Sequence, residues 1–275
     1  MIREDLLPIV RPRPSDTGGL VFAGGKEKDG MILVGKASSP ATGETYEIRD
    51  GYLDLLKART GADSLANLTN LLPGAGRGYE PLWRVHSLSL LTGERFPNER
   101  ELEIITSLVS PVSGGRYLDL GCSAGLYARS LARGLDNITV VGIDISPSML
   151  REAVRRARGI GASPSFVRAN AKNLPFTDAA FTGAICGGSL NEFGAPERVL
   201  RETHRVLEPG GRLAIMGILR AGTPHGRRLQ RLLSTGGIKF FEPDELHSLL
   251  DHAGFEPDPL QTYSPVFFSG ATRRG

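Results

Sequence analysis

The sequence predicts an α/β fold, with a doubly wound, mostly parallel seven-stranded sheet preceded by a small β-rich appendage. Two observations support this prediction. From residue 98 to the C-terminus, short apolar runs alternate with amphipathic helical patterns, and near-continuous apolar strands are typical of a parallel sheet covered by helices on both faces. The first 57 residues are instead interrupted by many proline and glycine residues, which indicates short strands and turns.

Each expected element has its own local signal. Asn98 is a plausible N-cap for the helix that follows it, and Ser146-Pro147 opens another helix with a cap and a proline at the first helical position. The glycines of the Pro209-Gly210-Gly211 turn precede a long apolar strand. The sequence predicts strands at 116–120, 138–144, 166–167, 181–186, 212–219, 259–263 and 266–269, and helices at 98–109, 124–133, from 147, at 196–207 and from 243. The last two strands are expected to form an antiparallel hairpin at one edge.

Composition limits the class of protein. The chain has 275 residues, of which 40% are hydrophobic and 23% charged, as in an ordinary globular protein. We divide it into an appendage (1–57), a helical lid or connector (58–97) and a ligand-binding domain (98–275). No apolar run reaches the roughly 18 residues of a membrane span, and the acidic N-terminus lacks a signal peptide core, so a cytoplasmic location is expected. A net charge of +3 permits nucleic-acid binding but does not favour it, and the sequence leaves the oligomeric state open.

The first strand of the predicted sheet runs into a glycine turn, Leu118–Gly125. Ligands of such sheets bind beyond the carboxyl ends of the strands, where glycines allow the backbone a close approach. Asp119 precedes this turn, and its carboxylate would repel a phosphate but suit an ammonium or a sulfonium. Asp144 ends the next strand, where it is placed to accept the hydroxyls of a ribose. A positively charged amino-acid group joined to a ribose describes S-adenosylmethionine.

Five segments together resemble the successive motifs of class I S-adenosylmethionine-dependent methyltransferases, which have a Rossmann-like fold: 118–125, 140–150, 170–176, 187–190 and 207–213. The resemblance implies S-adenosylmethionine as cofactor, S-adenosylhomocysteine as product and no metal. It places the cofactor on ten residues: Asp119, Gly121, Ser123 and Gly125 at the methionine portion, Asp144 at the ribose, Ile145, Met149, Asn170 and Ala171 around the adenine, and Gly187 near the methyl group.

Two positions depart from the family pattern. Ser123 stands where the middle glycine is usual, which is tolerable if its backbone keeps an ordinary conformation. Asn170 stands where an aspartate is usual, and its amide oxygen can still accept a hydrogen bond from the adenine amino group.

No catalytic residue is evident from the sequence, and methyl transfer needs a base only if the acceptor must lose a proton. Glu192 is a candidate base and Asn191 a candidate orienting group, although both also fit a loop that caps the next helix. His225 lies in a segment interpreted as a loop facing the substrate. Cys122 and Cys186 are expected to be small core residues. The Asn-Pro-Pro motif of nucleobase amine methylation and the Pro-Cys pair of cytosine C5 methylation are absent.

The N-terminal region has a second resemblance. Residues 7–20 and 51–56 resemble the zinc-ribbon-like appendage of some small-molecule and ribosomal-RNA methyltransferases, but the region contains no cysteine, so its usual zinc ligands are missing. The segment from Gly78 to Pro97 resembles the lid of these relatives. Tyr79, Trp83 and Phe96 would then close over the substrate, or they pack in the core like other aromatic side chains.

The interpretation that follows is a small-molecule methyltransferase with a lipid-like, quinone-like or specialised acceptor. A ribosomal RNA methyltransferase and a non-catalytic S-adenosylmethionine-binding partner protein remain alternatives, and a nicotinamide-dependent oxidoreductase is disfavoured by Asp119.

Overall fold

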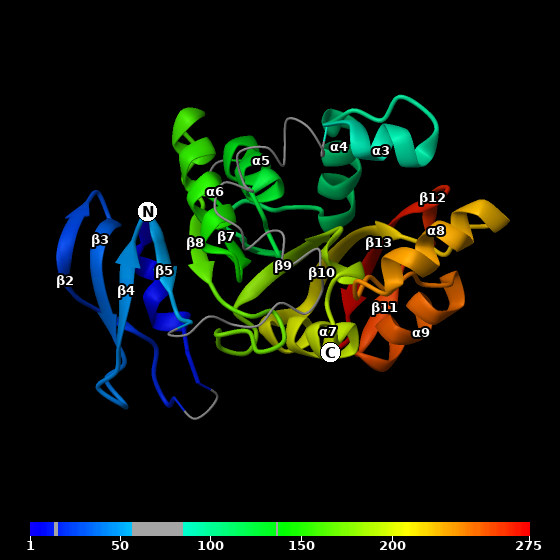
Figure 1. The fold of residues 1–275 in the computed structure, drawn as a ribbon. Helices are drawn as coiled ribbons and strands as arrows, with labels where there is room; N and C mark the ends of the chain where they lie inside the picture. Colours follow the sequence, from blue (N-terminus) through cyan, green and yellow to red (C-terminus); the bar gives the residue numbers. More distant parts are fainter. Residues whose placement is uncertain (14–15, 57–84, 136) are drawn as a thin grey trace.

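The computed structural model describes residues 1–13, 16–56, 85–135 and 137–275. One mixed sheet runs through the described part of the chain, in the order β1-β3-β4-β5-β8-β7-β6-β9-β10-β13-β11, with β2 and β12 attached to β3 and β13 (Figure 1). The strands are β1 (Ile2–Arg3), β2 (Val21–Lys28), β3 (Met31–Ser38), β4 (Thr45–Arg49), β5 (Tyr52–Asp54), β6 (Arg116–Leu120), β7 (Thr139–Asp144), β8 (Ser165–Arg168), β9 (Phe181–Gly187), β10 (Leu207–Ile218), β11 (Phe255–Pro257), β12 (Gln261–Tyr263) and β13 (Val266–Arg273).

The seven neighbours from β8 to β11 confirm the predicted doubly wound sheet. Strands β8, β7, β6, β9 and β10 are parallel, whereas β13 runs antiparallel between β10 and β11. The expected terminal hairpin, β12 with β13, is present, but β13 also lies inside the sheet. The strand β11 was not predicted, because its three residues, Phe255–Pro257, are too few to show a period.

Helices cover both faces of this sheet. In Figure 1, α4, α5 and α6 lie on one face, and α7 and α9 lie on the other. Each face has its own hydrophobic core, because the buried side chains of α4 to α6 form one cluster and those of α7 and α9 belong to another. The helices are α3 (Val85–Thr92), α4 (Asn98–Val109), α5 (Leu126–Gly134), α6 (Pro147–Gly159), α7 (Pro196–Val206), α8 (Pro224–Ser234) and α9 (Pro243–His252), with short 3-10 helices η1 (Glu4–Ile9) and η3 (Ser189–Asn191).

Strands β1 to β5 lengthen the sheet at its β8 edge and make the N-terminal region β-rich. Strand β5 pairs in parallel with β8, so that Leu53 is the partner of Val167. Beside this pairing, Arg168 forms a buried ion pair with Asp54 at 3.1 Å and donates to the Leu56 carbonyl at 2.9 Å. The ion pair and the hydrogen bond compensate these buried charges for the loss of their hydration. The resemblance of this region to a zinc-ribbon-like appendage remains a prediction.

Helix α8 occupies a segment that the sequence analysis interpreted as a loop. Its start has clear signals, because the Thr223 side chain accepts from Gly226 N–H at 3.1 Å and Pro224 holds the first helical position. Its leucines also follow helical spacing. Three arginines and one histidine in the same segment obscured this pattern, because a run of charged residues normally indicates a solvated surface. Within the described ranges, no helix is both long and apolar enough to cross a membrane.

Candidate functional site

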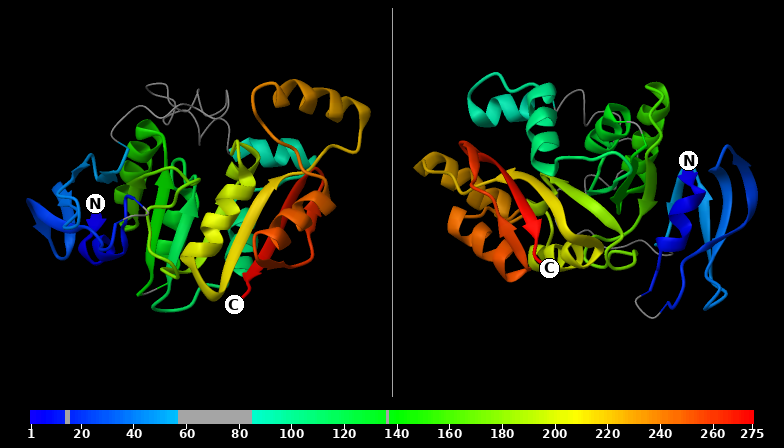
Figure 2. Two further views of the ribbon diagram at one scale, coloured as in Figure 1. Left: turned by 90° about the horizontal axis from the view of Figure 1, so that it is seen from below. Right: turned by 180° about the vertical axis from the view of Figure 1, so that it is seen from behind.

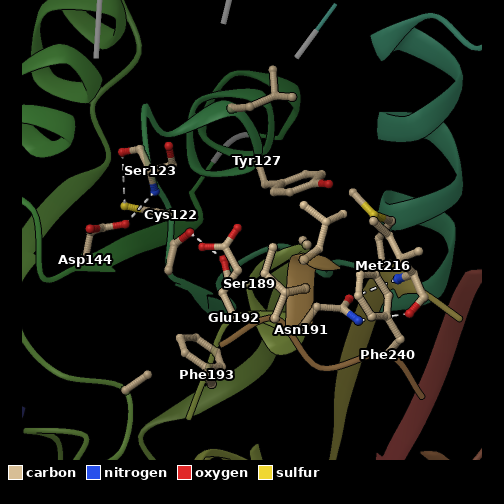
Figure 3. Close-up of a pocket in the computed structure, with 18 of the residues that line it drawn as sticks. Cys122, Ser123, Tyr127, Asp144, Ser189, Asn191, Glu192, Phe193, Met216 and Phe240 are labelled. Atoms are coloured by element: carbon tan, nitrogen blue, oxygen red, sulfur yellow. Dashed lines mark hydrogen bonds between the residues drawn. The ribbon is translucent and has the colours of Figure 1, made fainter. Parts of the chain in front are cut away.

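A cavity of about 480 Å³ opens at the carboxyl ends of the central parallel strands (Figure 3). Its walls come from the turns after β6, β7, β8 and β9 and from the end of β10, together with α3, α8 and the segment before α9. Loops at this edge of a doubly wound sheet are the usual ligand-binding region. The cavity has a polar end near β6 and β7 and an apolar end near β10 and α8.

The glycine turn after β6 places three residues with positive φ at alternate positions. Gly121 has φ 62°, Ser123 φ 49° and Gly125 φ 74°. A Cβ on Gly121 would lie 2.5 Å from Ser189 Oγ, a contact that real side chains do not make, so this position requires glycine. The Ser189 hydroxyl donates to the Gly121 carbonyl at 3.0 Å, and this bond ties the turn to the loop after β9.

Ser123 does not meet the condition under which a serine was judged tolerable in place of the usual glycine. That condition was an ordinary backbone conformation, but its φ of 49° lies in the left-handed region. For a residue with a Cβ this region costs roughly 1–2 kcal/mol. The conformation is held by the Ser123 N–H, which donates to Asp144 Oδ2 at 2.9 Å, and by its hydroxyl, which lies 3.5 Å from Met149 Sδ.

Asp144 lies at the end of β7 and lines the cavity. Its two carboxylate oxygens each accept a backbone N–H, one from Ser123 and the other from Ser146 at 2.8 Å. Burial raises the pKa of Asp144, while the backbone N–H groups that it accepts act in the opposite direction. The carboxylate is therefore held in one orientation, with its remaining lone pairs available to a ligand.

Three of the other expected cofactor residues lie beside Asp144 in the cavity wall: Ile145, Asn170 and Ala171. The Asn170 Oδ1 atom accepts from the Lys172 N–H at 2.9 Å, which closes a local side-chain turn. An amide oxygen has a second lone pair, so this bond leaves Asn170 able to accept from a ligand as well.

Three of the expected cofactor residues, Asp119, Gly125 and Met149, do not line the cavity, and Gly125 packs against Phe166 and Ala153 instead. Asp119 is buried, and its Oδ2 atom accepts from the Ala128 N–H of α5 at 3.0 Å. Its carboxylate therefore holds the first turn of the helix that follows the glycine turn. Met149 is buried beneath Ser123. Both side chains support the polar end from behind rather than facing into it.

Tyr127 is a cavity residue that the sequence analysis missed. A Cβ on Gly187 would lie 1.8 Å from the Tyr127 ring, so the aromatic ring rests directly on the expected methyl-site glycine. The Tyr127 hydroxyl donates to the buried carboxylate of Glu101 on α4. An aromatic residue two positions after the glycine turn was the available signal, but it could not show that α4 supplies the partner.

Asn191 and Glu192 differ in what they do. The buried amide of Asn191 donates to the Ile218 and Lys239 carbonyls at 2.9 and 2.6 Å and accepts from the Ile218 N–H at 2.9 Å. The residue thereby joins the loop after β9 to the end of β10 and to the segment before α9. Glu192 follows it and lines the cavity (Figure 3). Asn191 also lines the cavity, but the three hydrogen bonds of its amide give it a structural role, and its assignment as an orienting group stays a prediction.

The apolar end of the cavity depends on segments far apart in the sequence. Met216 and Ile218 come from β10, and the α8 residues Leu229 and Leu233 lie across from them. The wall is completed by Leu88, Leu91, Ile238, Phe240 and Pro265. These residues were not identified from the sequence, and only the leucine spacing of α8 gave a signal for them.

The remaining candidates lie elsewhere. His225 is exposed at the start of α8 and is not part of the cavity wall. Phe96 is buried in the core, stacked on Phe268 with ring centres 5.8 Å apart, and does not line the cavity. Tyr79 and Trp83 lie outside the described residues.

Both cysteines are free and buried. Burial raises the pKa of Cys122 well above its ordinary value and that of Cys186 to about 12. Thiolates are therefore disfavoured at both positions, and neither residue is suited to act as a nucleophile.

Comparison with known proteins identifies this architecture. The family model described as "Methyltransferase domain" matches residues 118–215. The demethylmenaquinone methyltransferase of Thermotoga maritima is 30% identical over 190 residues, which cover 61% of this chain and 80% of the relative. The 2-phytyl-1,4-naphtoquinone methyltransferase of Nostoc punctiforme is 37% identical over 123 residues, which cover 44% of this chain and 54% of the relative.

A solved structure has the same fold. The [4+2]-cyclase SpnF matches with a TM-score of 0.59 and 21% identity, over 80% of this chain and 98% of that one. Fold, glycine turn and sequence relatives together define a methyltransferase. The chain belongs to the class I S-adenosylmethionine-dependent methyltransferases.

Proposed function

We propose that this enzyme methylates a lipophilic, quinone-like small molecule, with the acceptor held at the apolar end of the cavity. The observation that carries the proposal is the composition of that end, where leucine, isoleucine, methionine and phenylalanine side chains from α3, β10, α8 and residues 238–240 converge. Burying an aromatic or isoprenoid group against such a wall is favourable in proportion to the apolar area that it removes from water. The relatives from Thermotoga maritima and Nostoc punctiforme are named for quinone acceptors, in agreement with this chemistry.

The polar end fits S-adenosylmethionine. Gly121 brings the backbone of the turn into the cavity wall without a side chain of its own, and the oriented carboxylate of Asp144 is suited to the hydroxyls of a ribose. We assign the adenine to Ile145, Asn170 and Ala171, which line the same stretch of wall. In this assignment Asp119 and Met149 support the cofactor site without contacting the ligand.

S-adenosylmethionine, when bound, supplies a methyl group on a sulfonium, and transfer of that group to the acceptor leaves S-adenosylhomocysteine. The residues of the chain act mainly by positioning the two reactants, because holding the reacting atoms in line accounts for much of such a rate enhancement. The ring of Tyr127 on Gly187 forms the wall where the two ends of the cavity meet. Its bond to Glu101 fixes the ring in that place and helps to exclude water.

We assign the general base to Glu192. An acceptor hydroxyl or an activated ring carbon loses a proton during methylation, and a carboxylate within reach can accept it. Glu192 lines the cavity, and the hydrogen bonds of the adjacent Asn191 hold its loop in place. His225, exposed and outside the cavity wall, has no place in this scheme.

The experiment that tests the proposal is transfer of isotopically labelled methyl from S-adenosylmethionine to a demethylated naphthoquinol, by the wild type and by Asp144→Ala and Glu192→Gln. We expect label in the quinol with the wild type, none with Asp144→Ala, and a lower kcat with unchanged cofactor affinity for Glu192→Gln. A host-cell extract separated into small molecules, RNA and protein is assayed in parallel. Label in the RNA or protein fraction, with none in small molecules, would overturn the proposal.

A further inference from the structure

Helix α8 carries an unusual surface for a helix beside an active-site cavity. Leu229, Leu232 and Leu233 are 58%, 67% and 41% exposed, although leucine side chains of this spacing normally turn toward a core. In the left view of Figure 2, α8 stands at the outer margin of the molecule, away from the sheet.

The exposed leucines are continuous with the interior of the cavity. Leu229 and Leu233 line the cavity, whereas Leu232, at the spacing i+3 from Leu229, lies outside it. Leu91 of α3 is also exposed and lines the same opening. An apolar path therefore leads from the acceptor end of the cavity to the surface of α8.

The rest of α8 is basic. Arg227, Arg228 and Arg231 are exposed, and the helix contains no acidic residue. Among the residues that the structure describes, no carboxylate forms an ion pair with these three. Two of the three acidic side chains nearest in the sequence pair with other cations, Glu242 with Arg220 at 3.3 Å and Glu245 with Lys239 at 3.2 Å, and the third, Asp244, is exposed in the first turn of α9 and forms no ion pair with these arginines. Arg228 and Arg231 lie one helical turn apart, and repulsion between like charges at this spacing destabilises a helix. An external anionic surface would offset that repulsion.

One buried polar side chain of α8, Gln230, bonds the helix to the segment that follows β10. Gln230 donates to the Leu219 carbonyl at 2.8 Å and accepts from the Ala221 N–H at 2.7 Å. These bonds fix the rotation of α8 about its axis, so that Gln230 faces the protein and Leu232 with Arg228 faces outward.

We propose that α8 docks on the surface of an anionic phospholipid bilayer, so that a lipophilic acceptor passes from the membrane into the cavity. This inference rests on the proposed function, because it supplies the route by which such an acceptor reaches the site. A helix with exposed leucines and flanking arginines binds at the interface through buried apolar area together with attraction to anionic headgroups.

A second copy of the chain fits the same surface poorly. In a two-fold contact between α8 helices, each residue patch meets its own equivalent. Three arginines from each copy would then meet across an apolar contact without a carboxylate from either helix. Anionic lipid headgroups neutralise these charges, whereas a symmetric dimer would bring them together.

The test is binding of the full-length enzyme to vesicles of phosphatidylcholine, with and without phosphatidylglycerol, measured by flotation. We expect binding only to the anionic vesicles and weakening at high salt. Leu232→Ser should weaken binding by about tenfold, because one leucine no longer inserts, and Arg228→Glu by more than about fivefold, because an attractive charge becomes repulsive. Val112→Ser and Arg201→Glu are the matched controls, since these exposed residues lie outside α8, and they should bind as the wild type does.

Three outcomes would overturn the inference: no binding to anionic vesicles, equal binding by wild type and both α8 variants, or loss of a dimer rather than of vesicle binding in the Leu232→Ser variant. Leu232 does not line the cavity, so Leu232→Ser and Arg228→Glu should retain the wild-type affinity for S-adenosylmethionine, which verifies folding. Vesicle binding requires no methyl transfer, so it succeeds or fails separately from the assay with the quinol. Methylation of a vesicle-embedded quinol should fall in the α8 variants, while that of a short-chain, water-soluble quinol should not.

Discussion

The two ends of the cavity are built by different means. At the polar end, the Gly121–Gly125 turn and the Asp144 carboxylate are held by backbone hydrogen bonds between neighbouring strand ends. At the apolar end, side chains from α3, β10, α8 and residues 238–240 meet without a shared motif. Polar recognition requires oriented donors and acceptors, whereas apolar contact requires only shape and area. The polar end therefore depends on the orientation of a few groups, whereas the apolar end depends on the area that its side chains present.

The largest expected effect breaks the polar end. Asp144→Ala removes a carboxylate that would bind the ribose and that also holds Ser123 and Ser146. Charge-assisted hydrogen bonds contribute about 1.5–3 kcal/mol each, so we expect the Kd for S-adenosylmethionine, measured by calorimetry, to rise by at least about 100-fold. Asp178→Ala, at an exposed ion pair with Arg205, is the control. Unchanged affinity in Asp144→Ala would show that the cofactor is bound elsewhere.

The second prediction concerns Asn191, which joins the loop after β9 to the end of β10 and to the segment before α9. Asn191→Ala leaves the Ile218 N–H and the carbonyls of Ile218 and Lys239 without their partner. Unsatisfied buried polar groups cost about 1–3 kcal/mol each, and partial hydration reduces their sum, so we expect the free energy of unfolding to fall by about 2–4 kcal/mol in urea titrations. Asn173→Ala, whose side chain bonds only at an exposed position, should change it little. A result in which both variants are equally stable would contradict a structural role for Asn191.

A smaller effect is expected from a substitution that should weaken acceptor binding without changing cofactor binding. Ile238→Ala removes apolar surface from the acceptor end alone. We expect the KM for a quinol acceptor to rise by about tenfold, from the loss of roughly 1.5 kcal/mol of apolar contact, with the Kd for S-adenosylmethionine unchanged. Ile160→Ala, at an exposed position at the end of α6, controls for general effects. Equal changes in both constants would mean that the two ends are not independent.

The smallest effect concerns backbone strain in the turn. Ser123→Gly removes the Cβ from a residue with φ 49°, while its N–H can still donate to Asp144. Relief of the strain, offset in part by the greater entropy of glycine in the unfolded chain, should raise the free energy of unfolding by about 0.5–1 kcal/mol. Thermal unfolding measures this change. A loss of stability would show that the serine hydroxyl contributes more than its backbone conformation costs.

Much of the sheet was predictable because its signals are local. Apolar runs, caps such as Ser146 and the glycine turn at 121–125 each depend on residues within one element, and most expected boundaries agree with the structure within a few residues. The exceptions are short or ambiguous. β11 has three residues, and α8 mixes leucines with arginines in a pattern that charge alone assigns to the surface.

The candidate site was only partly predictable for a different reason. A motif shows which residues stand near a strand end, but it does not show which way their side chains point. Asp119 and Asp144 both lie near strand ends, yet one holds the backbone of α5 and the other lines the cavity. Asn191, a candidate orienting group, bonds to Ile218 and Lys239, and its place in the motif could not indicate these partners because they are distant in the sequence.

By itself the sequence determined the doubly wound architecture and the family and indicated the strand ends at which the cavity opens, because each is encoded by periodicity or by residues adjacent along the chain. The tertiary structure decided the strained conformation of Ser123, the contact of Tyr127 with Gly187 and Glu101, and the apolar end with its exposed leucines on α8. These features arise from contacts between residues widely separated in sequence, and only packing of the folded chain brings those residues together.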